Sequence, residues 1–396
     1  MTRQSLLKIA ISTAIVSASS TAVMAEPLIT DYEKATSAYE DAYFSGNLNL
    51  DSGNQDQTSY DLDLSIDYEK VFSSKNRNTK LDFLGTGTVS RGSSSGDDRE
   101  STYQALGSAT VDNYFNADKS NAFWYGKGEV GVKKGQEDPF TKATAGVGYG
   151  RVVNVTPMAR SIRIVQELRE NGFITSDPSN ATYQKIAQII EREAEYRSKY
   201  GYEDYEQYWV QDIETELKAS GLTNGATGLN ARAILKSYDV LVNERISTRK
   251  SGWLVRAGVG AVLSDYDGED GKPALEIGAE YHKPLSNRTQ FSNEAIATAT
   301  LKDGDDSFNF NNAMSLTHEL TDKIDWENKW TLDHNESDTG PELTTNTVGS
   351  TFLYSLTNKL DFSVEARLTD TDDRIANNGN DELDKSLTMG VRYRLK

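Results

Sequence analysis

The sequence predicts an all-β transmembrane antiparallel barrel of about 14 strands, with an α-helical insertion between strands 6 and 7. Three observations support this fold class. Apolar and polar residues alternate along most of the chain, short turns alternate with long loops, and no segment supplies the roughly 18 apolar residues of a transmembrane helix. Between residues 156 and 249 the alternation gives way to apolar residues at helical spacing.

Residues 1–25 have the three parts of a secretory signal peptide. Arg3 and Lys8 precede an apolar run from Ile9 to Val16, and small residues follow as far as Ala25. We expect cleavage after Ala25, because small residues precede the cleavage site of such peptides. The mature protein is therefore expected to be exported.

The composition narrows the classes of protein to consider. The chain has no cysteine, so an exported protein of this length cannot be a small disulfide scaffold. Removal of residues 1–25, which contain two bases and no acid, takes the net charge from −18 to about −20. Such acidity argues against a nucleic-acid partner. A hydrophobic content of 37% fits a barrel, since only one face of each strand meets lipid.

The first half of the barrel, residues 26–155, is expected to contain about six strands. Its clearest segment runs from Tyr60 to Tyr68, where aspartate and serine alternate with apolar residues. This period of two is typical of a strand with one apolar and one polar face. The predicted strands lie near 43–51, 57–71, 78–91, 101–115, 121–134 and 140–153.

The helical insertion, residues 156–249, is expected to contain four helices. Thr156-Pro157 predicts a helix cap followed by proline in the first turn, and Asn171-Gly172 predicts the end of that helix. Apolar stripes predict the other three helices near 181–200, 205–219 and 229–246. Together these helices would form a small subdomain.

The second half of the barrel, residues 250–396, is expected to contain about eight strands. The segments 360–369 and 386–396 both alternate apolar with charged or hydroxylated residues. The predicted strands lie near 250–265, 273–285, 288–301, 306–320, 323–334, 344–357, 359–370 and 384–396.

The connections between these strands alternate in length. Tight turns such as 73–76, 116–119 and 321–323 alternate with acidic or glycine-rich loops such as 93–98 and 265–272. In bacterial barrels the short turns face the periplasm and the long loops face outward, so an even strand number brings both termini to the periplasm. By this parity the helical insertion is expected on the periplasmic side.

The alternating strands, the asymmetry of the turns and a strand at the C-terminus together resemble a Gram-negative outer-membrane β-barrel of porin-like type. The resemblance covers the mature chain outside the insertion and selects no one family. It implies location in the cell outer membrane, contact with outer-membrane lipid and insertion by the barrel assembly machinery. Such barrels usually end on an aromatic residue, whereas this chain ends Leu395-Lys396.

Aromatic residues on the predicted outward face are typical of the girdles at the two membrane interfaces. They are Trp253, Trp326, Trp330, Tyr281, Tyr354, Phe362 and Tyr393. The alternative is strand packing in a soluble sandwich. The barrel is favoured because closure removes the exposed edge strands that a long series of strands would leave.

The inward positions of the strands carry many charges, more of them acidic than basic. The candidates for lining the lumen are Asp61, Asp63, Asp67, Glu129, Glu276, Glu280, Glu294, Asp325, Glu327, Lys329, Asp361, Glu365, Arg367, Arg392 and Arg394. An excess of acids would bias a water-filled lumen toward cations. The alternative is that these charges pair between neighbouring strands and stiffen the wall.

A cluster of aromatic residues stands out in the insertion. Tyr202, Tyr205, Tyr208 and Trp209 lie close together in the sequence. They either form the core of the subdomain or present rigid aromatic surfaces to a periplasmic protein or to peptidoglycan.

Catalytic and cofactor motifs are missing from the sequence. Only His282, His318 and His334 are present as imidazole bases, and no nucleophile motif surrounds them. Asp333-His334 is similar to the acid and histidine pair of a barrel protease, but one dipeptide is weak evidence. No metal-ligand spacing, nucleotide motif or cofactor site is predicted, and acidic loops such as 303–306 are expected to be solvated.

Two functions remain. The first is a porin-like channel for small hydrophilic, cationic solutes, with access limited by the helical insertion. The second is a structural or assembly protein of the outer membrane, in which the barrel anchors an insertion that binds a periplasmic partner or peptidoglycan. The position of the helices distinguishes them, because helices outside a polar lumen favour transport.

Overall fold

The structure is a computed structural model that describes residues 28–395, apart from 33, 35, 118, 224–228, 267, 269–270, 302–305, 339–341 and 376–381. The predicted signal peptide lies outside the described residues. Among the described helices, none has the length and apolar character needed to cross a bilayer.

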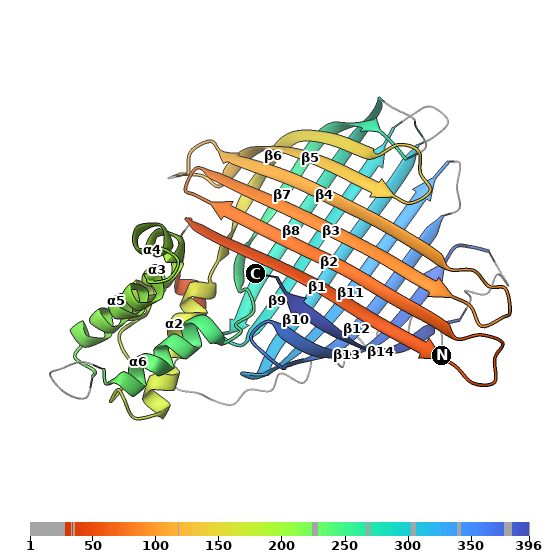
Figure 1. The fold of residues 1–396 in the computed structure, drawn as a ribbon. Helices are drawn as coiled ribbons and strands as arrows, with labels where there is room; N and C mark the ends of the chain where they lie inside the picture. Colours follow the sequence, from red (N-terminus) through yellow and green to blue (C-terminus); the bar gives the residue numbers. More distant parts are fainter. Residues whose placement is uncertain are drawn as a thin grey trace, which may run out of the picture.

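The strands form a closed antiparallel ring (Figure 1). Each strand pairs with its neighbours in the chain, and β1 closes the ring by pairing with β14. The strands are β1 (Ser37–Asp51), β2 (Ser59–Ser73), β3 (Arg77–Arg91), β4 (Glu100–Tyr114), β5 (Ala122–Lys133), β6 (Phe140–Asn154), β7 (Lys250–Ser264), β8 (Lys272–Ser286), β9 (Thr289–Thr300), β10 (Ser307–Thr321), β11 (Ile324–Ser337), β12 (Leu343–Ser355), β13 (Leu360–Asp372) and β14 (Asp384–Arg394). The predicted fold class is confirmed.

Strand β1 begins earlier than predicted, at Ser37 rather than near residue 43. The alternation is inverted at its start, where the aromatic Tyr39 lies over Lys250 inside the barrel. On the opposite face Glu40 forms an ion pair with Lys70. An aromatic residue inside and a charge outside conceal the usual pattern of a barrel strand, so the sequence did not predict this start.

The outer surface of the ring is apolar. Val259 and Ile277 are 65% and 64% exposed on neighbouring strands, and Leu387 and Met389 are exposed on β14. Exposed apolar side chains that alternate with inward polar residues are expected where a barrel wall contacts lipid. Most of the expected outward aromatic residues lie on this surface near the strand ends that the short turns join, and Trp326 stacks on Phe352 of the adjacent strand.

Glycines allow two aromatic side chains to lie flat against the inner wall. Phe123 and Tyr125 of β5 are buried and face Gly148 and Gly146 of β6. A Cβ atom on Gly146 would lie 2.6 Å from the Tyr125 ring and 2.2 Å from the carbonyl oxygen of Ala257. Any side chain there would displace the ring and the β7 backbone, so this part of the wall requires glycine.

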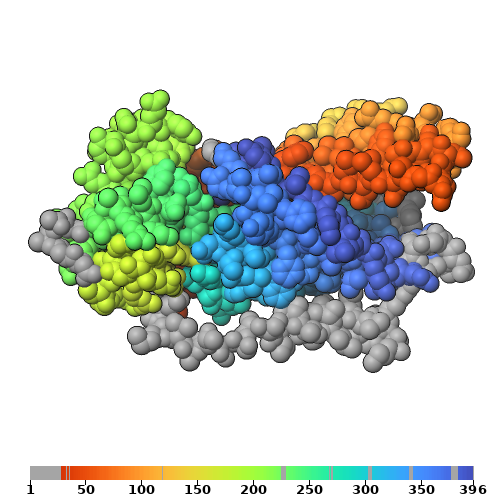
Figure 2. Space-filling model, turned by 60° about the horizontal axis from the view of Figure 1, so that its bottom comes forward, coloured from red at the N-terminus to blue at the C-terminus, as the bar shows by residue number. Residues whose placement is uncertain are grey.

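Five helices and one π-helical turn form a compact domain at one end of the barrel. They are α2 (Thr156–Glu170), α3 (Asn180–Glu191), α4 (Glu193–Tyr200), α5 (Tyr205–Ala219), α6 (Ala231–Tyr238) and η2 (Asp239–Asn243). Figures 1 and 2 show the domain beyond the ends of the strands. Its apolar core also includes Ile29, the first residue of the short helix η1 (Ile29–Asp31), and Tyr32, which follows that helix.

Three details of the insertion differ from the sequence prediction. The helix expected over 181–200 is broken at Arg192 into α3 and α4. The last helix ends at Tyr238 and continues as the π-helical turn η2. Thr156 is the first helical residue rather than the cap, and its hydroxyl donates to Asn154 Oδ1. Ser179 and Asn230, which the sequence analysis did not single out, cap α3 and α6 by accepting backbone N–H bonds.

The helical domain and the short turns lie at the same end of the ring. The connections there, apart from the helical domain itself, are 74–76, 115–121, 287–288, 322–323 and 356–359. At the opposite end the chain passes from β1 to β2, from β3 to β4, from β5 to β6, from β7 to β8, from β9 to β10, from β11 to β12 and from β13 to β14. Below, the two ends are called the helical end and the loop end.

Candidate functional site: the lumen and its helical end

The predicted lumen residues occupy inward positions of the strands, on the face opposite the apolar outer surface. Eleven of the fifteen form ion pairs: Glu129, Glu276, Glu280, Glu294, Asp325, Glu327, Asp361, Glu365, Arg367, Arg392 and Arg394. Within the described part of the chain, the structure shows no ion pair for Asp61, Asp63, Asp67 or Lys329. Some of these pairs, such as Glu276–Lys142 and Glu327–Arg392, join strands that are not neighbours, whereas others join neighbouring strands as expected.

One cluster crosses the lumen from β7 and β9 to β2 and β3. Lys250 Nζ lies 2.8 Å from Glu69 Oε1, and Lys80 Nζ lies 3.2 Å from the same oxygen. Lys80 Nζ also lies 3.8 Å from Glu294 Oε2. Strands β2 and β9 are on opposite sides of the ring, so the lumen is narrow at this level.

A second group of charges adjoins this cluster on the wall formed by β4, β7 and β8. Arg256 Nη2 lies 3.0 Å from Glu280 Oε1 and 3.9 Å from Asp112 Oδ2. His282 Nε2 lies 3.7 Å from both Glu280 and Glu294 and links the two groups. Because Asp112 and Glu280 are not on adjacent strands, Arg256 holds separate parts of the wall together.

A third group lies on β5, β6 and β8. Lys142 Nζ is 2.6 Å from Glu276 Oε2 and 3.1 Å from Glu129 Oε2, and Lys127 contacts the same two acids. Two bases and two acids therefore neutralise one another in a buried environment. Buried charges are tolerated when they are paired in this way.

Little free volume remains among the first two groups. A cavity of about 30 Å³ is bounded there by Tyr39, Glu69, Lys80, Lys250 and Arg256, among other residues. This volume suits about one water molecule.

The lumen is polar and more accessible nearer the loop end. Asp61, Asp63 and Asp67 on β2 are exposed, as are Lys329 on β11 and Arg367 on β13. Thr88 and Thr102 exchange a hydrogen bond of 2.7 Å on the adjoining β3 and β4. Exposed charges and hydroxyls at inward positions are what a water-filled passage requires.

The helical end is crossed by the segment that joins η2 to β7. We call residues 244–249 the strap. Thr248 Oγ1 donates a 2.6 Å hydrogen bond to Asp41 on β1, whereas the next residue, Arg249, donates to the carbonyl of Asn287 between β8 and β9. Since β1 and β8 are on opposite sides of the ring, the strap reaches both sides of the barrel mouth.

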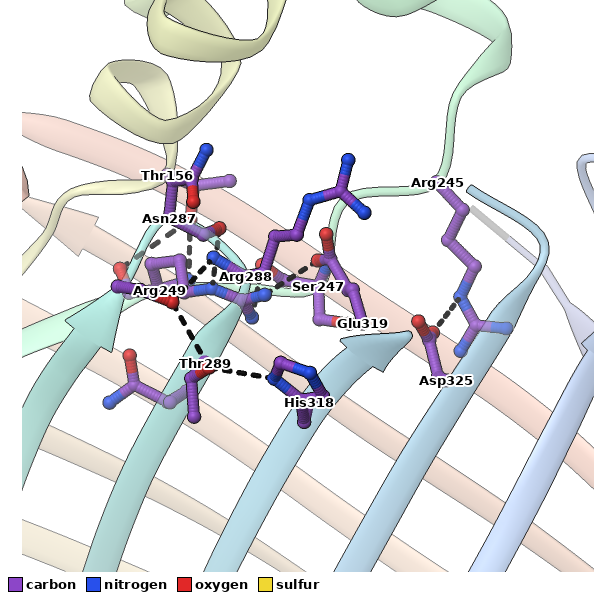
Figure 3. A network of polar contacts seen from close by, with 12 residues as sticks. Thr156, Arg245, Ser247, Arg249, Asn287, Arg288, Thr289, His318, Glu319 and Asp325 are labelled. Atoms are coloured by element: carbon purple, nitrogen blue, oxygen red, sulfur yellow. Dashed lines mark hydrogen bonds and ion pairs between the residues drawn. The ribbon is translucent and has the colours of Figure 1, made fainter. Parts of the chain in front are cut away.

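Two arginines fix the strap to carboxylates on the barrel rim (Figure 3). Arg245 pairs with Asp361 on β13, and its Nε lies 3.8 Å from Asp325 on β11. Arg249 Nη2 lies 2.6 Å from Glu319 Oε1, and the Ser247 N–H donates to the same oxygen at 3.1 Å. The strap therefore contacts β1, β10, β11 and β13.

Glu319 also holds the helical domain. Its second oxygen, Oε2, lies 2.8 Å from Arg163 of α2. Arg249 is 0% exposed, and Glu319 and Arg163 are each 2% exposed. One buried carboxylate thus joins a strand, the strap and the first helix of the domain.

Glu244, at the start of the strap, lies 3.0 Å from Arg163 Nη1. Burial, together with the negative charges of Asp322 and Glu319, nevertheless raises the pKa of Glu244 to about 7. The charged form is thus disfavoured in the folded state. The folded state retains the proton up to a higher pH than the unfolded chain does, so this contribution to stability is present below the ordinary pKa of 4.5 and is lost as the pH rises through about 7.

In the wild type, the helical domain should lose stability between pH 5 and pH 8. We expect this loss to be smaller in Glu244→Gln, by roughly 1 to 3 kcal/mol. The measurement is thermal loss of the helical circular-dichroism signal at both pH values. Glu170→Gln, at the exposed end of α2, is the matched control. Equal pH dependence in wild type and Glu244→Gln would contradict the assignment.

The structure separates the four aromatic candidates of the insertion. Trp209 is 2% exposed and donates to the Ile189 carbonyl at 2.8 Å, and Tyr205 is buried with its hydroxyl bonded to Glu193. These two belong to the domain core and form no surface for a partner. Tyr202 is 75% exposed, and Tyr208 stacks on Tyr200 with ring centroids 3.9 Å apart.

Asp333 and His334 do not form a pair. Asp333 hydrogen-bonds with Asn311 on the inner face, and His334 Nδ1 contacts Thr344 Oγ1 at 2.8 Å. As successive strand residues, they point to opposite faces of the sheet. Among the described residues, no group of three or more potential ligands is placed to hold a metal ion.

Several residues of this site were missed by the sequence analysis. Arg163, Arg245 and Arg249 were treated as parts of helices or polar connections, and Tyr39 preceded the predicted first strand. The sequence signal that could have found the three arginines was their charge. They are basic residues of the insertion in a chain whose net charge is −18. Only the fold shows which carboxylates they meet.

The closed ring of paired strands and its apolar outer surface decide the class of protein. The described strands of this chain form a closed, 14-stranded antiparallel β-barrel with the outer surface of a membrane-spanning barrel. Residues 244–356, less than half of the chain, match a family described as "Protein of unknown function, DUF481". This match begins at the first residue of the strap. A search of curated proteins finds no match.

Solved structures with similar folds include an outer membrane channel from Pseudomonas putida F1, with a TM-score of 0.34 and 8% identity over 94% of this chain and 99% of that chain. The low-pH structure of OprB from Pseudomonas putida has a TM-score of 0.31 and 8% identity over 90% and 92%. The beta domain of the Bordetella autotransporter BrkA has a TM-score of 0.30 and 8% identity over 91% and 99%. Because these scores are low, the assignment rests on the strand order and surfaces of this chain.

Proposed function

We propose that the barrel is a channel for small hydrophilic solutes, with a preference for cations, and that the helical insertion limits access from the periplasm. The observation that carries this proposal is the combination of a charged, hydroxyl-rich inner wall with helices that lie beyond the barrel rather than inside it. A structural barrel has no need of exposed charges facing its own lumen, because such charges are costly unless they are hydrated or paired.

The periplasmic position of the insertion is supported by the short turns at the helical end, since short turns face the periplasm in bacterial barrels. Solutes would enter at the loop end, pass Asp61, Asp63 and Asp67, and reach the closed level formed by Lys80, Glu69 and Lys250. The cross-lumen ion pairs would have to separate for passage. No reaction is proposed for this protein, because Asp333 and His334 point to opposite faces.

The second candidate function is an outer-membrane anchor for a domain that binds a periplasmic protein or peptidoglycan. The exposed Tyr202 and the stacked pair of Tyr200 and Tyr208 favour it, since rigid aromatic surfaces suit such contacts. The channel is the better-supported proposal because the polar lumen has no part in anchoring.

Replacement of the exposed acids should reduce cation preference. We expect the triple variant Asp61→Asn, Asp63→Asn, Asp67→Asn to have a potassium-to-chloride permeability ratio several-fold below that of the wild type, because a negative lumen concentrates cations. The measurement is the reversal potential in planar bilayers across a salt gradient.

Asp98→Asn, in the exposed 92–99 loop, is the matched control and should leave the ratio nearly unchanged. An unchanged ratio in the triple variant, with conductance intact, would show that these acids do not line the conducting path.

A further inference from the structure

We propose that the strap, residues 244–249, is a latch that closes the barrel at its helical end and opens when the helical domain moves. The latch rests on the proposed channel function and adds its regulation. In the closed state the strap is bound by four carboxylates on the barrel rim, each from a different strand: Asp41, Glu319, Asp325 and Asp361.

The first argument is geometric. Thr248 and Arg249 are adjacent in the chain, yet one bonds to β1 and the other to the connection between β8 and β9. The next residue, Lys250, repeats this arrangement, because its Nζ pairs with Glu69 on β2 while its backbone N–H donates to Gln290 on β9. A segment that reaches opposite sides of the ring at successive residues lies across the lumen.

The second argument concerns mechanical coupling. Ile246, in the middle of the strap, is buried in the apolar core of the helical domain. Glu244 pairs with Arg163 of α2, and Arg163 pairs in turn with Glu319 on the barrel. A displacement of the helices therefore pulls on the strap and separates it from the rim.

The third argument concerns the chemistry of the contacts. Apart from Ile246, the side chains of the strap contact the rim mainly through charged and hydroxyl groups, although Arg245 also lies over the Tyr43 ring. Buried ion pairs recover much of their desolvation cost when water replaces the partner, so they stabilise a closed state less than apolar packing would and suit a reversible contact. Two of the rim acids keep other partners on release, since Asp361 lies 3.7 Å from Arg392 and Asp41 lies 3.6 Å from Arg394.

The test is single-channel recording of the full mature protein with the latch released or locked. The released variant is Arg245→Ala with Thr248→Ala. The locked variant is Asp41→Cys with Thr248→Cys, whose disulfide forms unambiguously because the chain has no other cysteine. Arg169→Ala, which removes an exposed ion pair with Asp177 in the same domain, is the control.

We expect release to raise the open-to-closed ratio by about tenfold or more, since each charge-assisted hydrogen bond removed shifts a two-state equilibrium by about an order of magnitude. The oxidised locked variant should conduct less than the wild type and recover on reduction. The control should behave as the wild type.

Two failures are distinguishable. If the wild type conducts and the locked variant, with its disulfide verified, conducts equally in both redox states, the latch is overturned while the channel stands. If the wild type, the released variant and the reduced locked variant are all folded and silent, the channel function itself is overturned and the latch with it.

Discussion

Glu319→Ala should cost about 3 to 5 kcal/mol of folding free energy, the range found when one partner of a buried ion pair is removed. Glu319 supplies one oxygen to Arg249 and the other to Arg163, and all three side chains are buried. The variant leaves two guanidinium groups in a poorly hydrated environment. It also removes an acceptor from the Ser247 N–H.

Urea unfolding in lipid vesicles, followed by tryptophan fluorescence, measures this loss. Glu137→Ala, in the exposed 134–139 connection, is the control and should change the free energy of unfolding by less than about 0.5 kcal/mol. A triple variant with Glu319→Leu, Arg163→Met and Arg249→Met should recover much of the stability, because apolar residues of similar volume replace buried ion pairs at little cost.

A loss below about 1 kcal/mol in Glu319→Ala would contradict this account. Such a value is typical of an exposed ion pair and would mean that water reaches the junction between barrel and helices.

The barrel was predictable because its signal is local. Each strand repeats an apolar and a polar residue, as in 60–68 and 360–369, and the pattern identifies the two faces of a strand without knowledge of its neighbours. The start of β1 was missed because Tyr39 faces inward and Glu40 outward, which reverses the rule on which the prediction depends. The ends of α2 and α4 followed from glycine in the same local way, whereas the break at Arg192 and the end of α6 at Tyr238 did not.

The ion pairs across the lumen were not predictable because they join residues on distant strands of the ring. Asp61 and Glu69 look alike in the sequence, since both are acids at inward positions of β2. Glu69 pairs with Lys250 from the far side of the barrel, whereas Asp61 is exposed near the loop end. Periodicity gives the face of a residue but neither the width of the lumen nor the partner opposite.

The aromatic cluster of the insertion shows the same limit. Tyr202 and Tyr205 are three residues apart and of one type, yet the first is exposed and the second is in the core. Tyr205 is the first residue of α5 and turns toward α4, where its hydroxyl meets Glu193. The packing of α4 against α5, which no local pattern encodes, decides which tyrosines a partner can reach.

Removal of residues 158–246, with the ends joined by a short linker, should convert the restricted barrel into a more open one. The deletion takes away the helical domain, Arg163, and the part of the strap that holds Arg245 and Ile246. Arg249 and Glu319 remain as a pair, whereas the buried Asp325 loses its contact with Arg245. We expect a steady conductance several-fold above that of the full-length protein, because the helical domain and the Arg245 contact that hold residues 247–249 across the barrel mouth are lost.

Single-channel conductance of the mature protein and of this deletion variant in planar bilayers tests the central claim most directly. A conducting full-length protein with cation preference, and a larger steady current from the deletion variant, is the predicted result. Two folded proteins that are both silent would contradict the channel and leave the periplasmic anchor as the better account of this barrel.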